Sequence, residues 1–235
     1  MQTSKRAAIN AAHRYSVVLS VFRVETRNPE LATGILLDSP RGLLLVTAGH
    51  VVQRFLALGA PGRLQIGVHR FTLQSIASES VRFSGKHNVV AINLESSDLD
   101  AIRKDALPFN RVASLPVSEG DLVAFVGYPG YWKEVRVNDV GLGSYEFFGP
   151  VRTVEPEQFS ILIDTTYEIR LTTGRRTSVR LTESLGGLSG APVFSTARPP
   201  LLVGWIYEGH LWSDRNHKLY GVHANAMTPS GTWVS

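Results

Sequence analysis

Short apolar runs separated by turn residues dominate the pattern along the chain. Val17 to Val24 is rich in β-branched residues, and the apolar runs Thr33 to Leu37 and Gly42 to Thr47 are separated by Asp-Ser-Pro-Arg. Such runs favour strands, and the polar separator favours a turn, so the last two predict a β-hairpin. Similar runs predict strands at Leu64–Val68, Phe71–Ser75, Val81–Phe83, Val89–Leu94, Leu122–Val126, Ser144–Phe148, Val151–Val154, Phe159–Ile163, Val193–Ser195, Leu201–Ile206 and Leu219–His223.

Helical patterns are few. Ser4 to His13 favours a short helix with Ser4 as its N-cap, and Ser97 to Lys104 favours a helical turn in a polar connector that continues to about Ala113. Many short strands with frequent turns and little helix indicate an all-β sandwich or barrel.

Composition indicates the class of protein and the compartment in which we expect it. The 235 residues suffice for one large domain or two small ones, and 43% hydrophobic with 19% charged residues is typical of soluble globular proteins. No signal peptide and no apolar run near the ~20 residues of a membrane span are evident, so we expect no membrane association. The absence of cysteine predicts a reducing compartment, the cytoplasm. A net charge of +4 permits only weak attraction to acidic partners.

The stretch from Leu185 to Phe194 reads Leu-Gly-Gly-Leu-Ser-Gly-Ala-Pro-Val-Phe, with three glycines around Ser189. Glycine permits positive φ and close backbone approach, so a serine on such a turn can point outward among backbone N–H groups. This arrangement suits an activated nucleophile beside an oxyanion hole. Gly-Ser-Gly clusters are more often plain turns, so the interpretation depends on partner residues elsewhere in the chain.

Two further segments supply such partners. Val46 to Val52 reads Val-Thr-Ala-Gly-His-Val-Val and resembles the Thr-Ala-Ala-His motif of the trypsin/chymotrypsin-like serine proteases, with His50 as the catalytic histidine. Thr33 to Leu36 is similar to the Gly-x-Gly-Phe-Leu segment of that family, and the loop at Ser189 resembles its Gly-x-Ser-Gly-x-Pro nucleophile loop. Histidine precedes serine, as in this family and unlike the α/β-hydrolases.

The resemblance implies two six-stranded antiparallel β-barrels with the active site in the cleft between them. We expect an N-terminal helical segment at residues 1–14, a first barrel at 15–112 and a second at 113–235. By resemblance, Ser189 is the nucleophile, His50 is the general base, and the backbone N–H groups of Gly187 and Ser189 bind the oxyanion. Leu188 stands where zymogen-activated members carry an aspartate, which implies an enzyme that is not activated by that route. No cofactor and no metal are implied.

The third triad position departs from the family pattern. The family places an aspartate at the head of Asp-x-Ala-x-x-x-Leu, and this chain has Asn88 there, in Asn-Val-Val-Ala-Ile-Asn-Leu. An asparagine carbonyl can accept the Nδ1 proton of His50, but it offers no charge to the imidazolium, and its amide end selects the wrong tautomer. Asp98 or Asp100 in the following connector is an alternative orienting group. His87 is expected to be an exposed loop residue.

Specificity residues also follow from the resemblance. Tyr207, Glu208 and Gly209 resemble the strand that pairs with the substrate backbone. Glu183 lies six residues before Ser189, at the base of the family's primary specificity pocket, and His223 resembles the back wall of that pocket. A buried carboxylate there would favour Arg or Lys before the scissile bond. The alternative is that Glu183 is solvated or is neutralised by His223.

We therefore expect a cytoplasmic serine endopeptidase that cleaves proteins or peptides through an acyl-enzyme, and a regulatory protein partner is a further option. The alternative is a pseudoprotease that binds proteins in its cleft after losing efficient turnover through Asn88. Nucleic-acid binding is not favoured, because the basic run has no interleaved aromatics and fits the solvated face of a hairpin. That run comprises Arg170, Arg175, Arg176 and Arg180.

Overall fold

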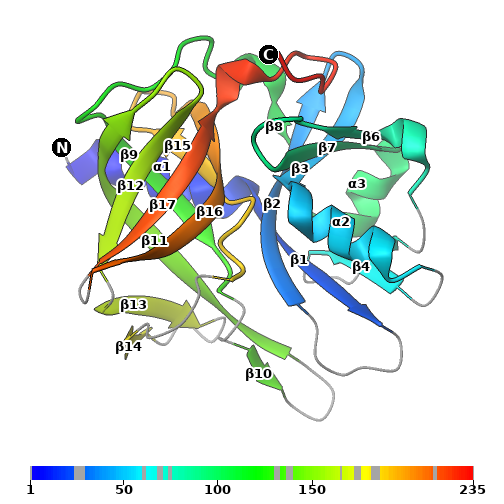
Figure 1. The fold of residues 1–235 in the computed structure, drawn as a ribbon, viewed down its shortest axis with the longest axis horizontal. Helices are drawn as coiled ribbons and strands as arrows, with labels where there is room; N and C mark the ends of the chain where they lie inside the picture. Colours follow the sequence, from blue (N-terminus) through cyan, green and yellow to red (C-terminus); the bar gives the residue numbers. More distant parts are fainter. Residues whose placement is uncertain are drawn as a thin grey trace.

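Two β-sheets lie side by side in the computed structural model (Figure 1). Helix α1 (Gln2–Tyr15) packs against the second sheet through β9 and β15. The structure describes residues 2–23, 30–59, 62–67, 71–73, 76–129, 133–135, 140–164, 166–171, 176–180, 186–213 and 216–234.

The first sheet is curled and has the strand order β5-β4-β1-β2-β3-β7-β6, with β8 parallel to β2. Its strands are β1 (Ser16–Arg23), β2 (Glu30–Ser39), β3 (Gly42–Ala48), β4 (Gly62–Ile66), β5 (Phe71–Leu73), β6 (Val81–Phe83), β7 (Val89–Leu94) and β8 (Leu107–Pro108). Helices α2 (Gly49–Ala57) and α3 (Ser96–Ile102) and the 3₁₀ turns Ser78–Ser80 and Phe109–Arg111 connect them. Apolar side chains from the strands and from α2 fill its concave face, including Leu19, Leu36, Leu45, Phe55 and Ile92.

The second sheet closes on itself. Its order is β12-β17-β16-β15-β9-β11, and β11 pairs with β12, which makes a six-stranded barrel. The strands are β9 (Leu122–Gly127), β10 (Lys133–Val135), β11 (Val140–Val154), β12 (Gln158–Asp164), β13 (Thr166–Leu171), β14 (Arg176–Arg180), β15 (Pro192–Ser195), β16 (Leu202–Ser213) and β17 (Asn216–His223), followed by a 3₁₀ turn at Ala224–Ala226.

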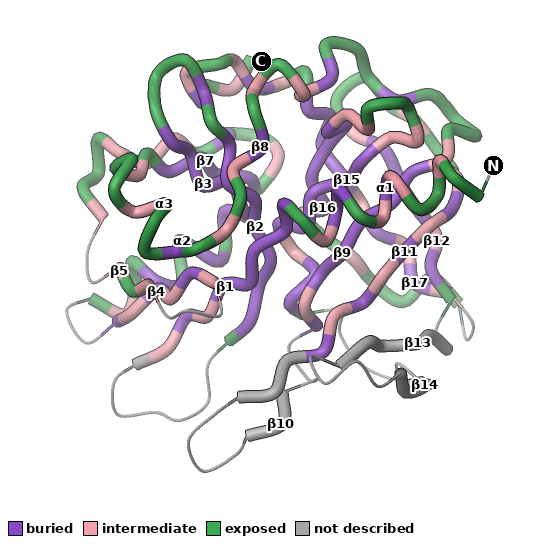
Figure 2. Tube along the Cα trace, turned by 180° about the vertical axis from the view of Figure 1, so that it is seen from behind, coloured by how far each residue is buried: buried purple, intermediate pink, exposed green. Residues whose placement is uncertain are grey.

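The all-β, two-barrel architecture is confirmed. The second sheet is a closed six-stranded barrel, whereas the first is a curled half-barrel for which the described strands show no closing pair. A separate apolar cluster joins the two sheets, and buried residues concentrate where they meet (Figure 2). It combines Ile35, Val46 and Ala91 of the first sheet with Phe194, Trp205 and Val222 of the second.

Two local features were not expected from the sequence pattern, and a third agrees with it. Residues 49–57 form helix α2 although Val51 and Val52 are β-branched, because both side chains are buried against the first sheet. The two strands expected at 144–148 and 151–154 are one strand, β11, in which Pro150 pairs with Leu122 at the very start of β9. The hairpin expected around Gly174 is present as β13 and β14, whereas Arg175 lies outside the described residues.

Within the described residues, no helix combines the length and the apolar character that crossing a lipid bilayer requires.

Candidate active site

Strand pairing brings His50 and Asn88 together. Strand β3 pairs with β7 so that Ala48, the last residue of β3, lies opposite Val89, the first residue of β7. His50 follows Ala48 by two residues, in α2, and Asn88 immediately precedes Val89. Gly49 N–H donates to the Asn88 carbonyl at 2.6 Å. A Cβ at Gly49 would lie 2.9 Å from Asn88 Oδ1, so glycine lets the two segments approach closely here. His50 is thereby fixed at the first turn of α2, facing Asn88.

The Asn88 amide has one orientation that satisfies both of its neighbours. Its Oδ1 accepts the His50 backbone N–H at 2.8 Å, and its Nδ2 lies 2.9 Å from His50 Nδ1. An amide nitrogen only donates, so Nδ1 is the acceptor and the neutral ring carries its proton on Nε2. Asn88 adopts a left-handed backbone conformation with φ of 46°, which asparagine tolerates better than most residues. The triad-like pair is therefore present in the tautomer opposite to the one that a general base needs.

The electrostatics of His50 favour its neutral form. His50 is exposed at the molecular surface, yet enough protein surrounds the ring that desolvation lowers its pKa from the ordinary 6.5. The carboxylates of Glu208 and Glu30 act in the opposite direction and do not outweigh desolvation. In the observed amide orientation, the N–H donated to Nδ1 also favours the neutral ring.

The loop that carries Ser189 is bound to strand β2 of the first sheet. Thr33 Oγ1 donates to the Gly187 carbonyl at 2.7 Å, and Thr33 N–H donates to the Ser189 carbonyl at 3.0 Å. Gly190 has φ of 89°, and a Cβ there would lie 1.9 Å from the Thr33 carbonyl oxygen. Glycine is therefore required at this position both for its conformation and for the close packing.

The backbone N–H groups expected to form the oxyanion hole are available. Gly187 has φ of 99°, and within the described residues neither Gly187 N–H nor Ser189 N–H donates a hydrogen bond. Leu188 between them is buried, with its side chain close to Gly127 of β9. The buried Leu188 and the bonds from Thr33 hold the loop from two sides.

His50, Asn88 and Ser189 line one cleft of about 380 Å³ between the two sheets. Within the described residues no hydrogen bond joins His50 to Ser189. Three other expected residues, Tyr207, Glu208 and Gly209 of β16, line the same cleft. Tyr207 is anchored there by a 2.6 Å hydrogen bond from its hydroxyl to Gln158 Oε1, and burial raises the pKa of its phenol to about 12. The remaining lining residues are Gly186, Leu188, Ile206 and Leu219.

Other sequence-based candidates lie elsewhere. Glu183 is outside the described residues. His223 is buried, its Nε2 lies 3.1 Å from the Glu155 carbonyl oxygen, its ring packs 5.4 Å from that of Phe159, and it does not line the cleft. Asp98 Oδ2 caps α3 by accepting the Glu95 N–H at 2.9 Å.

The expectation that His87 is an exposed loop residue is wrong. Its side chain is only 12% exposed, and Nε2 lies 3.5 Å from Glu157 Oε2. Glu157 lies in the turn between β11 and β12 of the second sheet and also forms a 2.9 Å ion pair with Lys86. Burial lowers the pKa of the His87 imidazole. The turn that presents Asn88 is thus tied across to the other sheet by a contact between residues distant in sequence.

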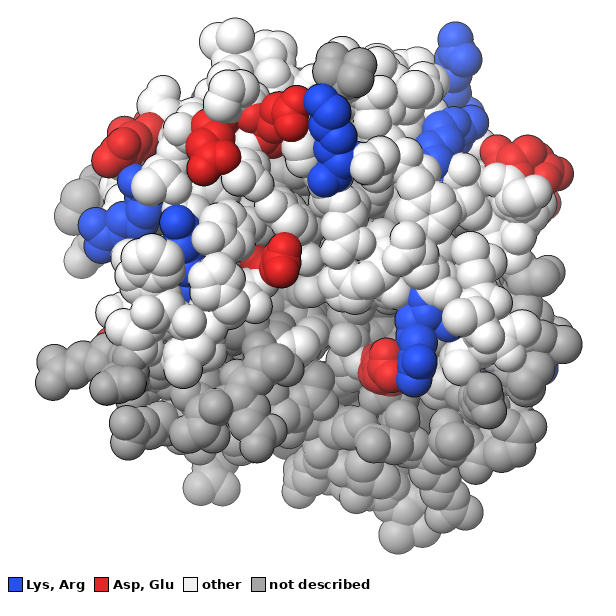
Figure 3. Space-filling view, in the orientation of Figure 1, with Lys and Arg blue, Asp and Glu red and all other residues white. Residues whose placement is uncertain are grey.

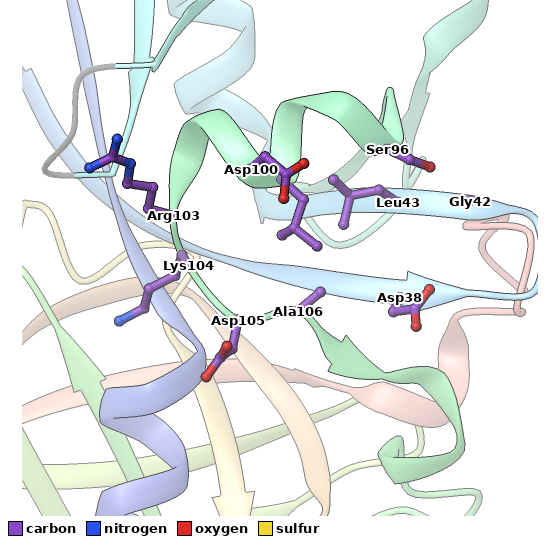
Figure 4. A pocket seen from close by; sticks show the side chains of 10 residues that line it. Asp38, Gly42, Leu43, Ser96, Asp100, Arg103, Lys104, Asp105 and Ala106 are labelled. Carbon is purple, nitrogen blue, oxygen red and sulfur yellow. The ribbon is translucent and has the colours of Figure 1, made fainter.

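A second cavity, of about 680 Å³, lies between α3 and the β2–β3 hairpin (Figure 4). It shares no lining residue with the cleft and includes Asp100, the other alternative orienting group. Two of its charged residues support α1: Lys104 Nζ donates to the His13 carbonyl at 2.8 Å, and Arg14 Nε donates to Asp105 at 2.6 Å. Neither Asp98 nor Asp100 therefore lines the cleft that holds His50.

The sequence did not reveal the role of Thr33, although a hydroxyl residue in the apolar run Leu31–Leu37 was an available signal. Among the described residues, no group of three or more His, Asp and Glu side chains is arranged to hold a metal ion. Lys and Arg side chains on the described part of one face are scattered among acidic ones and do not gather into one patch (Figure 3).

Comparisons with known proteins agree with this fold. No protein-family model and no curated protein matches the sequence. A thermostable serine protease AL20 from an extremophilic microorganism is 15% identical, with a TM-score of 0.53 over 90% of this chain and 91% of that one. The Rv3671c protease of M. tuberculosis in its active form is 15% identical, with a TM-score of 0.51 over 92% and 79%. A serine endoprotease from Yersinia pestis is 11% identical, with a TM-score of 0.54, and the match covers 94% of this chain and 61% of that one. The chain therefore has the two-barrel fold of the chymotrypsin-like serine proteases.

Proposed function

We propose that this protein is a serine endopeptidase that cleaves polypeptides through an acyl-enzyme at Ser189. The observation that carries the proposal is the meeting of His50, Asn88 and Ser189 at one cleft. Among the described residues, the backbone N–H groups of Gly187 and of Ser189 itself donate no hydrogen bond. Two sheets far apart in sequence supply these groups, and such convergence on a nucleophile, a base and an oxyanion site suits acyl transfer.

The chemistry assigns one step to each group. Ser189 Oγ attacks the peptide carbonyl carbon, its proton passes to His50 Nε2, and the N–H groups of Gly187 and Ser189 bind the oxyanion that forms. The imidazolium then protonates the leaving amine, and water, activated in the same way, releases the acyl group. Both attacks, by Ser189 Oγ and then by water, need an unprotonated Nε2, and departure of the amine needs the protonated ring.

Asn88 sets the rate of this cycle in our proposal. Freeing Nε2 requires its proton to move to Nδ1, and Asn88 Nδ2 must then turn away. Turning the amide takes Oδ1 from the His50 N–H, which is the 2.8 Å bond that fixes it. An asparagine in this position costs about 10⁴-fold in turnover in a trypsin-like triad. The enzyme is therefore slow with asparagine at this position.

The same observation supports a second candidate function, a protein-binding pseudoprotease. The cleft, its strand β16 and the oxyanion N–H groups all remain, while the wrong His50 tautomer suppresses proton transfer. Such a protein would hold an extended polypeptide without cleaving it. A regulatory protein partner would then be its ligand.

Two finer features belong to the same proposal. Glu183 at the base of the primary pocket gives a preference for Arg or Lys before the scissile bond. A cleavage profile that is unchanged in Glu183→Gln would contradict this role of Glu183. The lack of cysteine supports a cytoplasmic location.

Labelling with a fluorophosphonate tests the proposal directly. The probe forms a covalent bond only with a serine whose Oγ is activated. We expect slow, time-dependent labelling of the intact protein and none of Ser189→Ala. The absence of labelling in a folded protein, with saturable binding of an extended peptide, would instead support the pseudoprotease.

A further inference from the structure

Beyond the cleft, the hairpin of β16 and β17 carries a continuous row of aromatic rings. The ring of Tyr207 lies 6.5 Å from Tyr220, Tyr220 lies 5.4 Å from His210, and His210 lies 6.4 Å from Trp212. Lys218 Nζ sits over two of these rings, 4.9 Å from the centre of Trp212 and 5.0 Å from that of Tyr220. We call these five residues the aromatic–lysine strip.

The pairing of the hairpin explains the row. His210 pairs with Lys218 and Glu208 pairs with Tyr220, so their side chains share one face, and Trp212 lies on it two residues beyond His210. Rings at cross-strand and diagonal positions stack, and a lysine between two rings is held by cation–π attraction. The strip is therefore a preorganised surface.

The strip remains open to solvent. Trp212 is 58% exposed and the adjacent Leu211 is 53% exposed, and exposed apolar side chains that lie together are a feature of interaction sites. Its near end is the cleft itself, because Tyr207 belongs both to the cleft lining and to the strip. The far end, at Trp212, is five residues along β16, roughly 17 Å away at the rise of a strand.

Among the described strands, none pairs with the other edge of β16 along this length. The pairing of β15 with β16 ends at Trp205, and from Tyr207 onward the described strands pair with β16 only through β17. An extended polypeptide can add to such an edge by main-chain hydrogen bonds. Since β16 pairs antiparallel with both neighbours, an added strand that continues the sheet runs opposite to it. The segment over Trp212 then precedes the segment at Ser189 in sequence.

Charge decides which polypeptide fits. Glu208 lies at the cleft end of this face, and Lys218 lies toward its far end, with no ion pair to either among the described residues. A carboxylate upstream of the cleft would meet Lys218, and an aromatic side chain beside it would stack on Trp212 or His210. One lysine beside a glutamate is a poor match for a phosphate backbone, so the strip favours a polypeptide over nucleic acid.

We propose that the aromatic–lysine strip is a recognition site for an acidic and aromatic segment four to six residues before the scissile bond of the substrate. This inference rests on the proposed function in one respect, namely that the cleft holds a polypeptide. It names the sequence feature by which that polypeptide is selected.

Binding to the full chain carrying Ser189→Ala tests the strip without turnover. The probes are fluorescein-labelled peptides of sequence Asp-Phe-Asp-Ala-Ala-Arg-Ala-Ala and Ala-Ala-Ala-Ala-Ala-Arg-Ala-Ala, compared by fluorescence anisotropy. We expect the acidic probe to bind about fivefold more tightly, the effect of one charged contact with aromatic support. Lys218→Ala and Trp212→Ala should each reduce this advantage to less than twofold without changing the affinity of the alanine probe.

Matched controls keep the result interpretable. Arg41→Ala removes an exposed cation on the β2–β3 turn, and Leu115→Ala removes a side chain that is 74% exposed, so both should keep the full preference. Equal affinity for the two probes, or a preference for the acidic probe that persists in Lys218→Ala, would contradict the proposed role of the aromatic–lysine strip in recognition. So would tighter binding of a labelled 12-residue uridine RNA that Trp212→Ala abolishes. Because these measurements use the Ser189→Ala chain, a failure of fluorophosphonate labelling leaves them unaffected.

Discussion

A single amide decides how His50 can act. Asn88 Oδ1 takes the His50 backbone N–H at 2.8 Å, so Nδ2 must face Nδ1 at 2.9 Å. A carboxylate in the same place would accept at both atoms and would hold the proton on Nδ1. Asparagine and aspartate differ here by one donor group. With asparagine the proton of the neutral ring is on Nε2, whereas with aspartate it would be on Nδ1 and Nε2 would be free to accept the proton of Ser189.

We predict that Asn88→Asp raises the rate of fluorophosphonate labelling and of peptide-ester hydrolysis by up to about 10⁴-fold. The carboxylate stabilises the imidazolium, and the change in side-chain shape is minimal. Rates should be measured near neutral pH, with Ser189→Ala in the same background as the blank. Equal rates for the unsubstituted chain and the Asn88→Asp variant would mean that the orienting group lies elsewhere.

The same substitution should move the pH dependence. Labelling requires neutral His50, and because desolvation lowers the pKa of His50, the acid limb of the unsubstituted chain should lie below pH 6.5. A neighbouring carboxylate favours the charged ring and raises this pKa, so the acid limb should shift upward in Asn88→Asp. An unchanged or lower midpoint would show that residue 88 does not act on the ring.

At the scale of elements, strand β2 positions the serine loop of the opposite sheet. Thr33 is fully buried, donates through Oγ1 to Gly187, and accepts at that oxygen the Tyr128 N–H at 3.0 Å. Thr47 Oγ1 donates to the Thr33 carbonyl at 2.7 Å and so fixes the strand from the other side. Thr33 is thus a positioning residue for the oxyanion loop.

We predict that Thr33→Val slows labelling of Ser189 by roughly 10- to 100-fold and lowers the free energy of unfolding by about 1–3 kcal/mol. Valine keeps the shape but leaves the Gly187 carbonyl and the Tyr128 N–H without their partner. Thr33→Ser retains the hydroxyl and should keep most of the labelling rate. Unfolding in urea gives the stability of each variant separately. Loss of stability with an unchanged labelling rate would assign Thr33 to folding alone.

Local patterns predicted most strands, because alternating β-branched runs between turns carry their own signal. They did not predict α2, where burial of Val51 and Val52 overrides the low helix propensity of valine. They split β11 at Gly149-Pro150, although a proline can pair at the start of a neighbouring strand. Tertiary packing, which no local window contains, decided both cases.

Local sequence motifs likewise predicted some residues of the candidate site and missed others. Motifs marked His50, Asn88 and Ser189, since each lies in a short segment with its own pattern. The burial of His87 against Glu157 and the bond from Thr33 to Gly187 depend on partners far away in the sequence. The resemblance assigned His223 to the wall of a pocket whose expected base, Glu183, lies outside the described residues, and the ring of His223 lies against Phe159.

At the scale of the molecule, one apolar cluster is shared by the two sheets. Phe194 of β15 stacks on Tyr15 of α1 with ring centres 6.2 Å apart, and Trp205 meets Trp233 edge-on at 5.6 Å. Trp233 Nε1 also donates to the Arg82 carbonyl of β6 at 3.0 Å, which ties the C-terminal segment to the first sheet. Neither sheet can separate without exposing this cluster to water.

We therefore predict that both sheets unfold in one transition and that Phe194→Ala lowers the free energy of unfolding by about 3–5 kcal/mol for both together. Far-UV circular dichroism in urea gives the overall transition, and hydrogen exchange of peptides covering 43–48 and 122–127 reports on each sheet separately. The exposed control Leu115→Ala should change stability by no more than about 0.5 kcal/mol. If only the 122–127 peptide lost protection in Phe194→Ala, the sheets would be independent, and the cleft between them would depend on a weaker contact than their shared core. Coincident loss ties the geometry of the cleft to the stability of the whole fold, because the first sheet supplies His50 and the second supplies Ser189.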